Sequence, residues 1–246
     1  MTRLAYVVFI LSHVILSPIF SQAQNARPDT SFITHAIENT KQLYTASTHF
    51  ESSINNGGDY VEYNQRDEEH PYFMNDDWVM GSVLYDNDLY KDVPLMYDLS
   101  QQKLIFEHYS SANKISLVNK KINRFNIFGH TFIALEKSDK LHPSMPGGFY
   151  DLLYDGQIKV LVRRQKQLQE RIVSEDLEAE FEESNRYYIF KDKNYFPVKK
   201  KGSVLIVLAD QKSNLKQFIR KSKIRFGVNR EDALKRVAQF YDSLKK

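Results

Sequence analysis

Residues 149–164 read FYDLLYDGQIKVLVRR, and this stretch decides the fold. Two runs rich in aliphatic and aromatic residues flank the dipeptide Asp155-Gly156. An Asp-Gly pair between two apolar runs is a strong hairpin signal, because both residues suit the positive φ angles of a tight turn. The stretch therefore predicts two antiparallel strands, 149–154 and 157–164, joined at Asp155-Gly156.

Further strand-like segments precede this hairpin at short, regular spacing. The chain contains 15 Tyr and 16 Phe, and aromatic residues favour strands. Parallel strands would need a helical crossover between neighbours, for which these connections leave no room. We therefore expect an antiparallel meander, with Asp86-Asn87-Asp88 as one turn and Pro94 at an edge or a β-bulge. The candidate strands are Trp78–Tyr85, Leu89–Leu99, Lys103–His108, Lys114–Val118, Ile122–Phe128 and His130–Glu136.

Opposite charges follow the central hairpin. Arg163, Arg164, Lys166 and Arg171 precede Glu178, Glu180 and Glu182, and the glutamates alternate with apolar residues at strand period. A turn near Ser174-Glu175 would place the basic strand opposite the acidic strand, and each such pair contributes about 0.2–1 kcal/mol. This pattern favours sheet register over a binding groove. A last hairpin is predicted over 187–198, with its turn at 192–194.

Helical periodicity appears at both ends of the chain. Residues 32–48 predict a helix that Thr30 or Ser31 can cap. Near the C-terminus, Ser203 can cap a short helix ending at Leu208, and Asn229 can cap the final helix. The apolar stripes of these helices need a surface to pack on, and the sheet is the only large candidate. The stripe residues are Leu215, Phe218, Ile219 and Ser222, then Leu234, Val237, Ala238, Tyr241 and Leu244.

Together these elements predict one α+β domain. It is an antiparallel β-meander, a curved sheet or partly closed barrel, with one N-terminal helix and C-terminal helices. We expect a signal peptide over 1–23, a helix and turn over 24–58, the β region over 59–198, and a basic helical region over 199–246 packed on the same domain.

The first 23 residues are typical of a secretory signal peptide. Arg3 precedes an apolar run from Leu4 to Leu16, and Ser21-Gln22-Ala23 offers small residues before a cut at Gln24. The alternative is a membrane anchor, but a span needs roughly 20 apolar residues. The chain has no cysteine, which excludes disulfides and a lipid anchor on a cysteine. We therefore expect an exported protein, periplasmic or extracellular, that is not lipid-anchored.

Charge is divided along the chain. Residues 199–246 hold 14 Lys/Arg and 4 Asp/Glu, a net of +10, whereas residues 24–198 hold 19 and 27, a net of −8. The basic tail can bind an anionic partner, or it can dock on the acidic body of the same molecule. A membrane surface is one such partner through 199–246, because Lys216, Arg220, Lys221 and Lys223 would attract anionic lipid. We expect no nucleic acid in this compartment.

The motifs of common catalytic and metal sites are missing from the sequence. There is no H-E-x-x-H, no G-x-S-x-G and no phosphate-binding glycine loop. Asp86, Asp88 and Asp92 suggest calcium, but Tyr90 and Lys91 stand where an EF-hand loop needs an oxygen ligand and a glycine. The acidic runs 67–69 and 76–77 are typical of solvated surfaces. No catalytic residue, metal ligand or cofactor is therefore predicted from a motif.

Six stretches are informative together: 81–85, 93–99, 128–132, 148–156, 203–205 and 218–220. They resemble a family of secreted and envelope proteins common in Bacteroidetes that has no established activity. The resemblance covers most of the chain after the expected signal peptide. It implies an envelope location and a Gram-negative source, and it carries no catalytic residue or cofactor to this chain.

Three functions fit the sequence. The first is a non-enzymatic binding or interaction module, whose partner is an apolar ligand held by aromatic-rich strands or an envelope protein. The second is an enzyme with an unrecognised site, which would need polar residues such as His130, Asp98 and Asp151 to converge in one pocket. His130 alone more often serves as a hydrogen-bonded strand residue. The third is a membrane-surface protein that uses its basic tail.

Overall fold

The computed structural model describes residues 33–37, 39–40, 53–63, 70–108, 111–137, 141–173 and 176–245. The chain divides into two units, 1–50 and 51–246. In the first unit, residues 33–37 and 39–40 are helical, as the periodicity over 32–48 predicts. The rest of that helix and the signal peptide lie outside the described residues. Everything below concerns the second unit.

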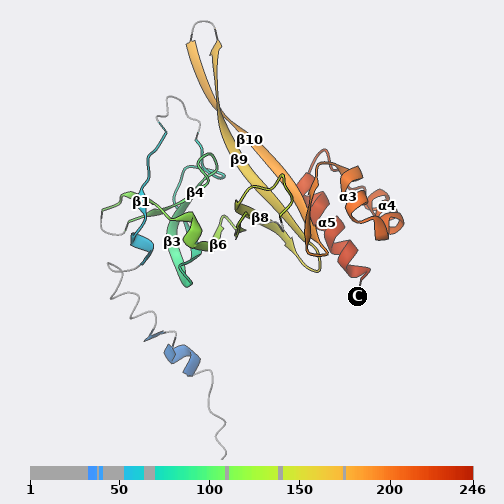
Figure 1. Cartoon of the computed structure of the whole chain (residues 1–246), viewed down its shortest axis with the longest axis horizontal. Helices are drawn as coiled ribbons and strands as arrows, with labels where there is room; N and C mark the ends of the chain where they lie inside the picture. The colour runs from blue at the N-terminus through green and yellow to red at the C-terminus, as the bar shows by residue number, and fades with distance from the viewer. Residues whose placement is uncertain are drawn as a thin grey trace, which may run out of the picture. The chain divides into compact units, whose positions relative to one another are not determined.

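The second unit is built on one antiparallel sheet of 11 strands that does not close, which confirms the predicted α+β meander (Figure 1). Most sequence neighbours are also neighbours in the sheet, and the order is β1-β5-β4-β3-β2-β6-β7-β8-β9-β10-β11. The strands are β1 (Gly58–Asp59), β2 (Val79–Tyr85), β3 (Asp88–Asp98), β4 (Lys103–Glu107), β5 (Lys114–Ser116), β6 (Ile122–Ile127), β7 (His130–Leu135), β8 (Gly148–Asp155), β9 (Lys159–Val173), β10 (Asp176–Lys191) and β11 (Asn194–Val198).

The tight turns follow the predicted chemistry. Asp86 and Asn87 both have positive φ between β2 and β3, and Asp192 and Lys193 do so between β10 and β11. Pro94 pairs with Met80 of β2 just before β3 begins its pairing with β4, next to a register shift at Gly81. Proline is tolerated there because no second neighbouring strand needs its missing N–H.

The Asp155-Gly156 turn differs from the prediction. Asp155 pairs with Lys159 as the last strand pair, so the loop spans 156–158 rather than two residues. The Asp242 carboxylate accepts hydrogen bonds from the Gln157 N–H, at 2.7 Å, and from the Tyr154 hydroxyl, at 2.9 Å. A carboxylate 85 residues away in the sequence thus stabilises the wider loop, and a local motif could not indicate it.

The inner side of the curved sheet is filled with aromatic rings. Tyr97 of β3 contacts Phe125 of β6 and Phe132 of β7 at centroid distances of 5.1 Å, and Phe149 of β8 at 5.9 Å. All four side chains are at most 1 % exposed. Strands far apart in the sheet order therefore meet through their side chains at the centre of this half.

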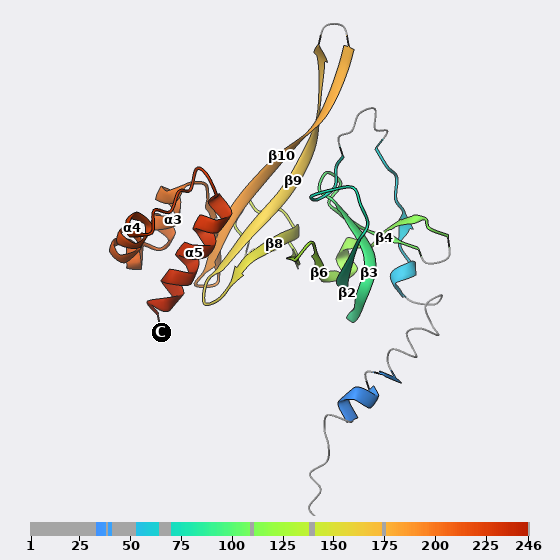
Figure 2. The same ribbon diagram turned by 180° about the vertical axis from the view of Figure 1, so that it is seen from behind.

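Three helices pack on the other half of the sheet (Figure 2). They are α3 (Lys201–Val207), α4 (Lys212–Lys221) and α5 (Arg230–Ser243). Asn229 caps α5 as predicted, its side chain accepting from the Asp232 N–H at 3.0 Å. Ser203 is not the cap of α3 but lies in its first turn, where its hydroxyl accepts from the backbone N–H groups of Lys199 and Lys200. Of the predicted stripe on α5, only Leu244 is exposed.

The ion pairs between the tail and the sheet use acidic residues of the tail. Asp210 accepts from Lys191 of β10 at 2.7 Å, and Glu231 pairs with Arg164 of β9 at 2.9 Å. Asp242 binds the β8–β9 loop as described above. The tail packs on the sheet of the same domain, and the ion pairs that join them run from tail carboxylates to sheet cations.

Candidate functional site

The β9–β10 hairpin continues far beyond the strands that flank it. β8 pairs with β9 only as far as Val162, and β11 pairs with β10 only from Tyr187. The two long strands pair with each other up to Val173 and Asp176. We call residues 167–173 and 176–182 the arm; it projects as a two-stranded ribbon in Figures 1 and 2. Within the described part of the chain, the arm forms strand pairs with nothing but itself.

The two faces of the arm differ. Phe181 lies on the face that contacts the body: it is 8 % exposed and meets the Tyr63 ring edge-on at 5.5 Å. Strand alternation assigns the positions of Glu178, Glu180 and Glu182 to the opposite face, and we call these three positions the acidic row. Glu180 and Glu182 are exposed. The arm therefore has the buried Phe181 on one face and exposed glutamates on the other.

The register places fewer opposite charges together than expected. Glu178 lies directly opposite Arg171, and Glu183 opposite Lys166. Gln169 and Gln167 stand opposite Glu180 and Glu182, and Arg163 stands opposite Arg186. Residues of opposite charge therefore stand directly opposite one another at two of the four glutamate positions 178, 180, 182 and 183.

A basic surface covers the outside of the C-terminal helices. From Lys212 to Arg230 the sequence holds seven Lys/Arg and no Asp/Glu. Lys212, Lys216 and Arg220, the basic row, are exposed at intervals of four along α4. Among the residues that the structure describes, the carboxylates of the tail on either side of this run form ion pairs with other residues. Asp210 and Glu231 pair with the sheet, and Asp232 pairs with Arg236. Ile206 and Val228 are also exposed, at 72 % and 81 %.

A buried network of charges joins the sheet to α5. Asp151 of β8, 1 % exposed, accepts from His130 Nδ1 at 2.8 Å and from Arg164 Nη2 at 2.6 Å. The Arg164 guanidinium also donates to both carboxylate oxygens of Glu231, at 2.9 and 3.0 Å. The Phe73 ring lies against both His130, at 5.1 Å, and Arg164, at 5.4 Å.

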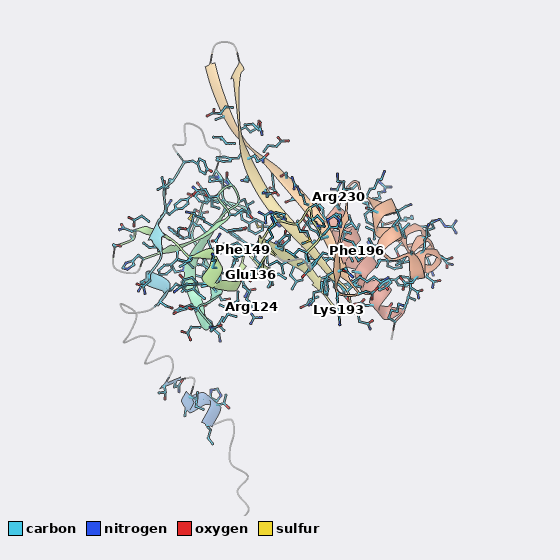
Figure 3. The ribbon with its side chains drawn as sticks, viewed as in Figure 1. Arg124, Glu136, Phe149, Lys193, Phe196 and Arg230 are labelled. Carbon is cyan, nitrogen blue, oxygen red and sulfur yellow. The ribbon has the colours of Figure 1, made fainter. Side chains whose placement is uncertain are left out.

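Arg164 is the centre of this network. Burial alone would lower the pKa of its guanidinium, but Glu231 and Asp151 outweigh burial and raise the pKa above its usual value. Two carboxylates therefore compensate one fully ionised guanidinium. Beside it, Arg230 at the start of α5, labelled in Figure 3, lies over the Tyr187 ring at 5.3 Å. The arrangement fixes the first turn of α5 on the hairpin.

Asp98 is part of a separate arrangement. Its carboxylate accepts from the Tyr60 hydroxyl at 2.7 Å and from the backbone N–H groups of Ser100 and Gln101 at 2.7 and 2.8 Å. Burial raises the pKa of Asp98, although these hydrogen bonds oppose the rise. Of the three residues that an enzyme was expected to bring together, only His130 and Asp151 meet. No described hydroxyl group forms a hydrogen bond with His130 that would make it the base of a nucleophile.

An open groove of about 410 Å³ lies elsewhere, over β2, β3 and β6, and none of His130, Asp98 and Asp151 lines it. Met80 and Leu89 form its exposed apolar part, with Lys91 and Arg124 beside them. Asp86, one of the carboxylates considered for calcium, forms an ion pair with Lys121 at 2.9 Å. No described group of three or more His, Asp or Glu side chains is placed to hold a metal ion.

The sequence did not predict that the arm projects from the sheet or that the basic row is exposed, and the reasons differ. The arm's strands were predicted, but strand alternation does not tell where neighbouring strands stop. The basic row was visible as charge, but its exposure depends on which residues the tail turns inward. No described helix is long and apolar enough to cross a membrane. Comparison of the chain with protein-family models, with curated proteins and with solved structures finds no match.

Proposed function

We propose that this chain is a non-enzymatic interaction protein that works through its outer charged surfaces. The arm is the observation that carries the proposal. Its strands leave the sheet, pair only with each other among the described residues, and expose Glu180 and Glu182 of the acidic row. It adds little to the buried core, because Phe181 is its one buried side chain among those described.

The physical cost of the arm supports a role in binding. An isolated two-stranded ribbon is marginal in water, because ordering its backbone costs about 1–2 kcal/mol per residue with little apolar burial in return. Its unpaired strand edges also present rows of N–H and C=O groups. A partner that covers the ribbon would supply the missing burial and hydrogen bonds.

The interior and the polar network support the same proposal. The side chains of Tyr97, Phe125, Phe132 and Phe149 are buried in one cluster, so they fill the interior of this half of the sheet. Asp151 and Arg164 are already bonded to each other and to their neighbours. An exported envelope protein that binds another macromolecule, rather than a small ligand or a substrate, fits these observations.

Native mass spectrometry tests this proposal. The full chain is purified gently, after mild cross-linking in the exporting cell. We expect assemblies heavier than one chain and no stoichiometric small molecule. A single chain that retains a bound small molecule, or that turns over a substrate in a screen of hydrolysable esters, would contradict the proposal.

A membrane-surface role is the second candidate, favoured by the unbroken run of cations between Lys212 and Arg230 and by the exposed Ile206 and Val228. Cations near an anionic membrane contribute about 1 kcal/mol each. Sedimentation with phosphatidylglycerol vesicles tests it. Lys-to-Glu changes at Lys216, Lys221 and Lys223 should abolish vesicle binding, whereas unchanged binding would exclude this role for the tail.

A further inference from the structure

The acidic arm and the basic helix α4 are complementary in charge. The sequence over 167–182 carries a net charge of −5, and the sequence over 212–230 carries +7. Strand alternation and helix periodicity give each row three ionisable positions. In the described range, Glu180, Glu182 and all three cations of the basic row are exposed.

The spacing within the two rows also matches. Alternate residues of a strand are about 6.6 Å apart, because each residue rises about 3.3 Å. Residues four apart on a helix are separated by about 6 Å along its axis, at 1.5 Å per residue. Three carboxylates of the acidic row therefore span about 13 Å and three cations of the basic row about 12 Å. An α4 helix laid along the arm can pair all three positions.

One molecule cannot pair all three positions of the acidic row with its own basic row. The helices pack on the opposite end of the hairpin, in a cluster that includes Val160 and Val162 of β9, Ile189 of β10, and Leu215 of α4. From Val162 the strand runs nine residues to Arg171, which lies opposite Glu178. That length of strand carries the Glu178 end of the acidic row about 30 Å beyond Val162, whereas the Glu182 end, opposite Gln167, lies about 16 Å beyond it.

We infer that the acidic row of one copy binds the basic row of a second copy, in a head-to-tail contact. This inference rests on the proposed function and names its partner. Because the two surfaces differ, the contact is heterologous and forms a closed ring or an open chain, depending on the rotation between copies. Charge complementarity selects the second copy over an arbitrary partner, since every copy supplies both rows.

Reversal of the charges tests this inference. In one variant the acidic row becomes lysine (E178K/E180K/E182K), and in another the basic row becomes glutamate (K212E/K216E/R220E). We expect each variant alone to weaken self-association at least tenfold in sedimentation velocity at low salt. An equimolar mixture of the two variants should restore association, because each reversed row then meets a reversed partner. Added salt should weaken every such contact.

Matched variants control for net charge. D76K/D88K/E136K and K91E/K120E/K137E change the same number of exposed charges away from both rows, and they should associate as the unchanged chain does. Circular dichroism melting checks that all variants fold.

The outcomes separate the two proposals. Association that the row variants weaken and the mixture restores supports the head-to-tail contact. If the unchanged chain stays monomeric while cross-linking still captures an envelope protein, the head-to-tail contact is wrong and the proposed interaction function stands. If the chain stays monomeric and the basic-row variant loses only vesicle binding, the partner of the tail is the membrane. A monomeric chain without partner or vesicle binding overturns both proposals.

Discussion

The two ends of the β9–β10 hairpin have the same secondary structure and opposite surroundings. At one end, Lys159–Val162 and Tyr187–Phe190 pair with each other and with a further strand on either side, and α3–α5 cover them. At the other end, the arm has neither flanking strands nor helices among the described residues. The difference shows that strand pairing alone does not place a segment in the core. Burial does, and the segment left outside the core exposes Glu180 and Glu182.

We expect the largest effect on stability at Arg164, which lies in β9 between the two ends of the hairpin. In the variant Arg164→Met, Asp151 and Glu231 lose the cation that compensates them, and Asp151 is 1 % exposed. Breaking a buried ion pair by removing one partner costs about 3–5 kcal/mol. Urea unfolding should show a loss of this size.

Arg186→Met is the matched control for Arg164→Met. Arg186 is exposed on the neighbouring strand, so its loss should change the free energy of unfolding by less than about 0.5 kcal/mol. The double variant Asp151→Leu/Arg164→Met should be less destabilised than Arg164→Met, because no orphan charge remains at Asp151. Equal losses for Arg164→Met and Arg186→Met would refute the role of the network.

Two leucines allow a direct comparison between the arm and the opposite end of the hairpin, which α3–α5 cover and which we call the covered end. Leu215 of α4 is 0 % exposed beneath the helices, whereas Leu168 of the arm is 38 % exposed. Leu215→Ala should cost about 2–5 kcal/mol, the usual range for a buried leucine. Leu168→Ala should cost less than about 1 kcal/mol. Similar costs in thermal or urea unfolding would mean that the arm belongs to the folded core.

A smaller effect concerns the pH dependence of the covered end. Partial burial alone would raise the pKa of Asp210, but hydrogen bonds from Lys191, Lys245 and Tyr241 outweigh it and lower the pKa below its ordinary 3.8. A depressed pKa in the folded state adds stability above pH 3.8, and that stability is lost as the pH falls through the folded value. Asp210→Asn should therefore lower stability at pH 7 and flatten the acid side of the stability curve.

Asp192→Asn is the control for the pH experiment. Asp192 is 81 % exposed, and its carboxylate lies 3.9 Å from Lys191 Nζ, a longer separation than the 2.7 Å of the Asp210 pair. It should leave the pH dependence of unfolding unchanged. An acid limb that is as steep in Asp210→Asn as in the unchanged chain would show that Asp210 does not link the tail to the sheet.

The sequence predicted which segments form strands more reliably than it predicted what covers them. Alternation, Asp-Asn turns and the Asn229 cap are local, and the structure confirms them. The three-residue loop at 156–158, the pairing of Arg164 with Glu231, and the inward-facing tail carboxylates all depend on residues distant in the sequence. His130 and Asp151 were named as candidates and do meet, but Asp98 lies apart because Tyr60 and the following turn bind it.

The comparison between the covered end and the arm can be tested by shortening the arm. Replacing residues 169–180 by Asn-Gly keeps the pair Leu168–Phe181 and closes the ribbon with a favoured two-residue turn. We predict that the free energy of unfolding of the shortened chain lies within about 1 kcal/mol of that of the full chain, and that the shortened chain no longer forms the heavier assemblies in native mass spectrometry. A shortened chain that still assembles, or that fails to fold, would contradict the claim that the arm is an interaction surface.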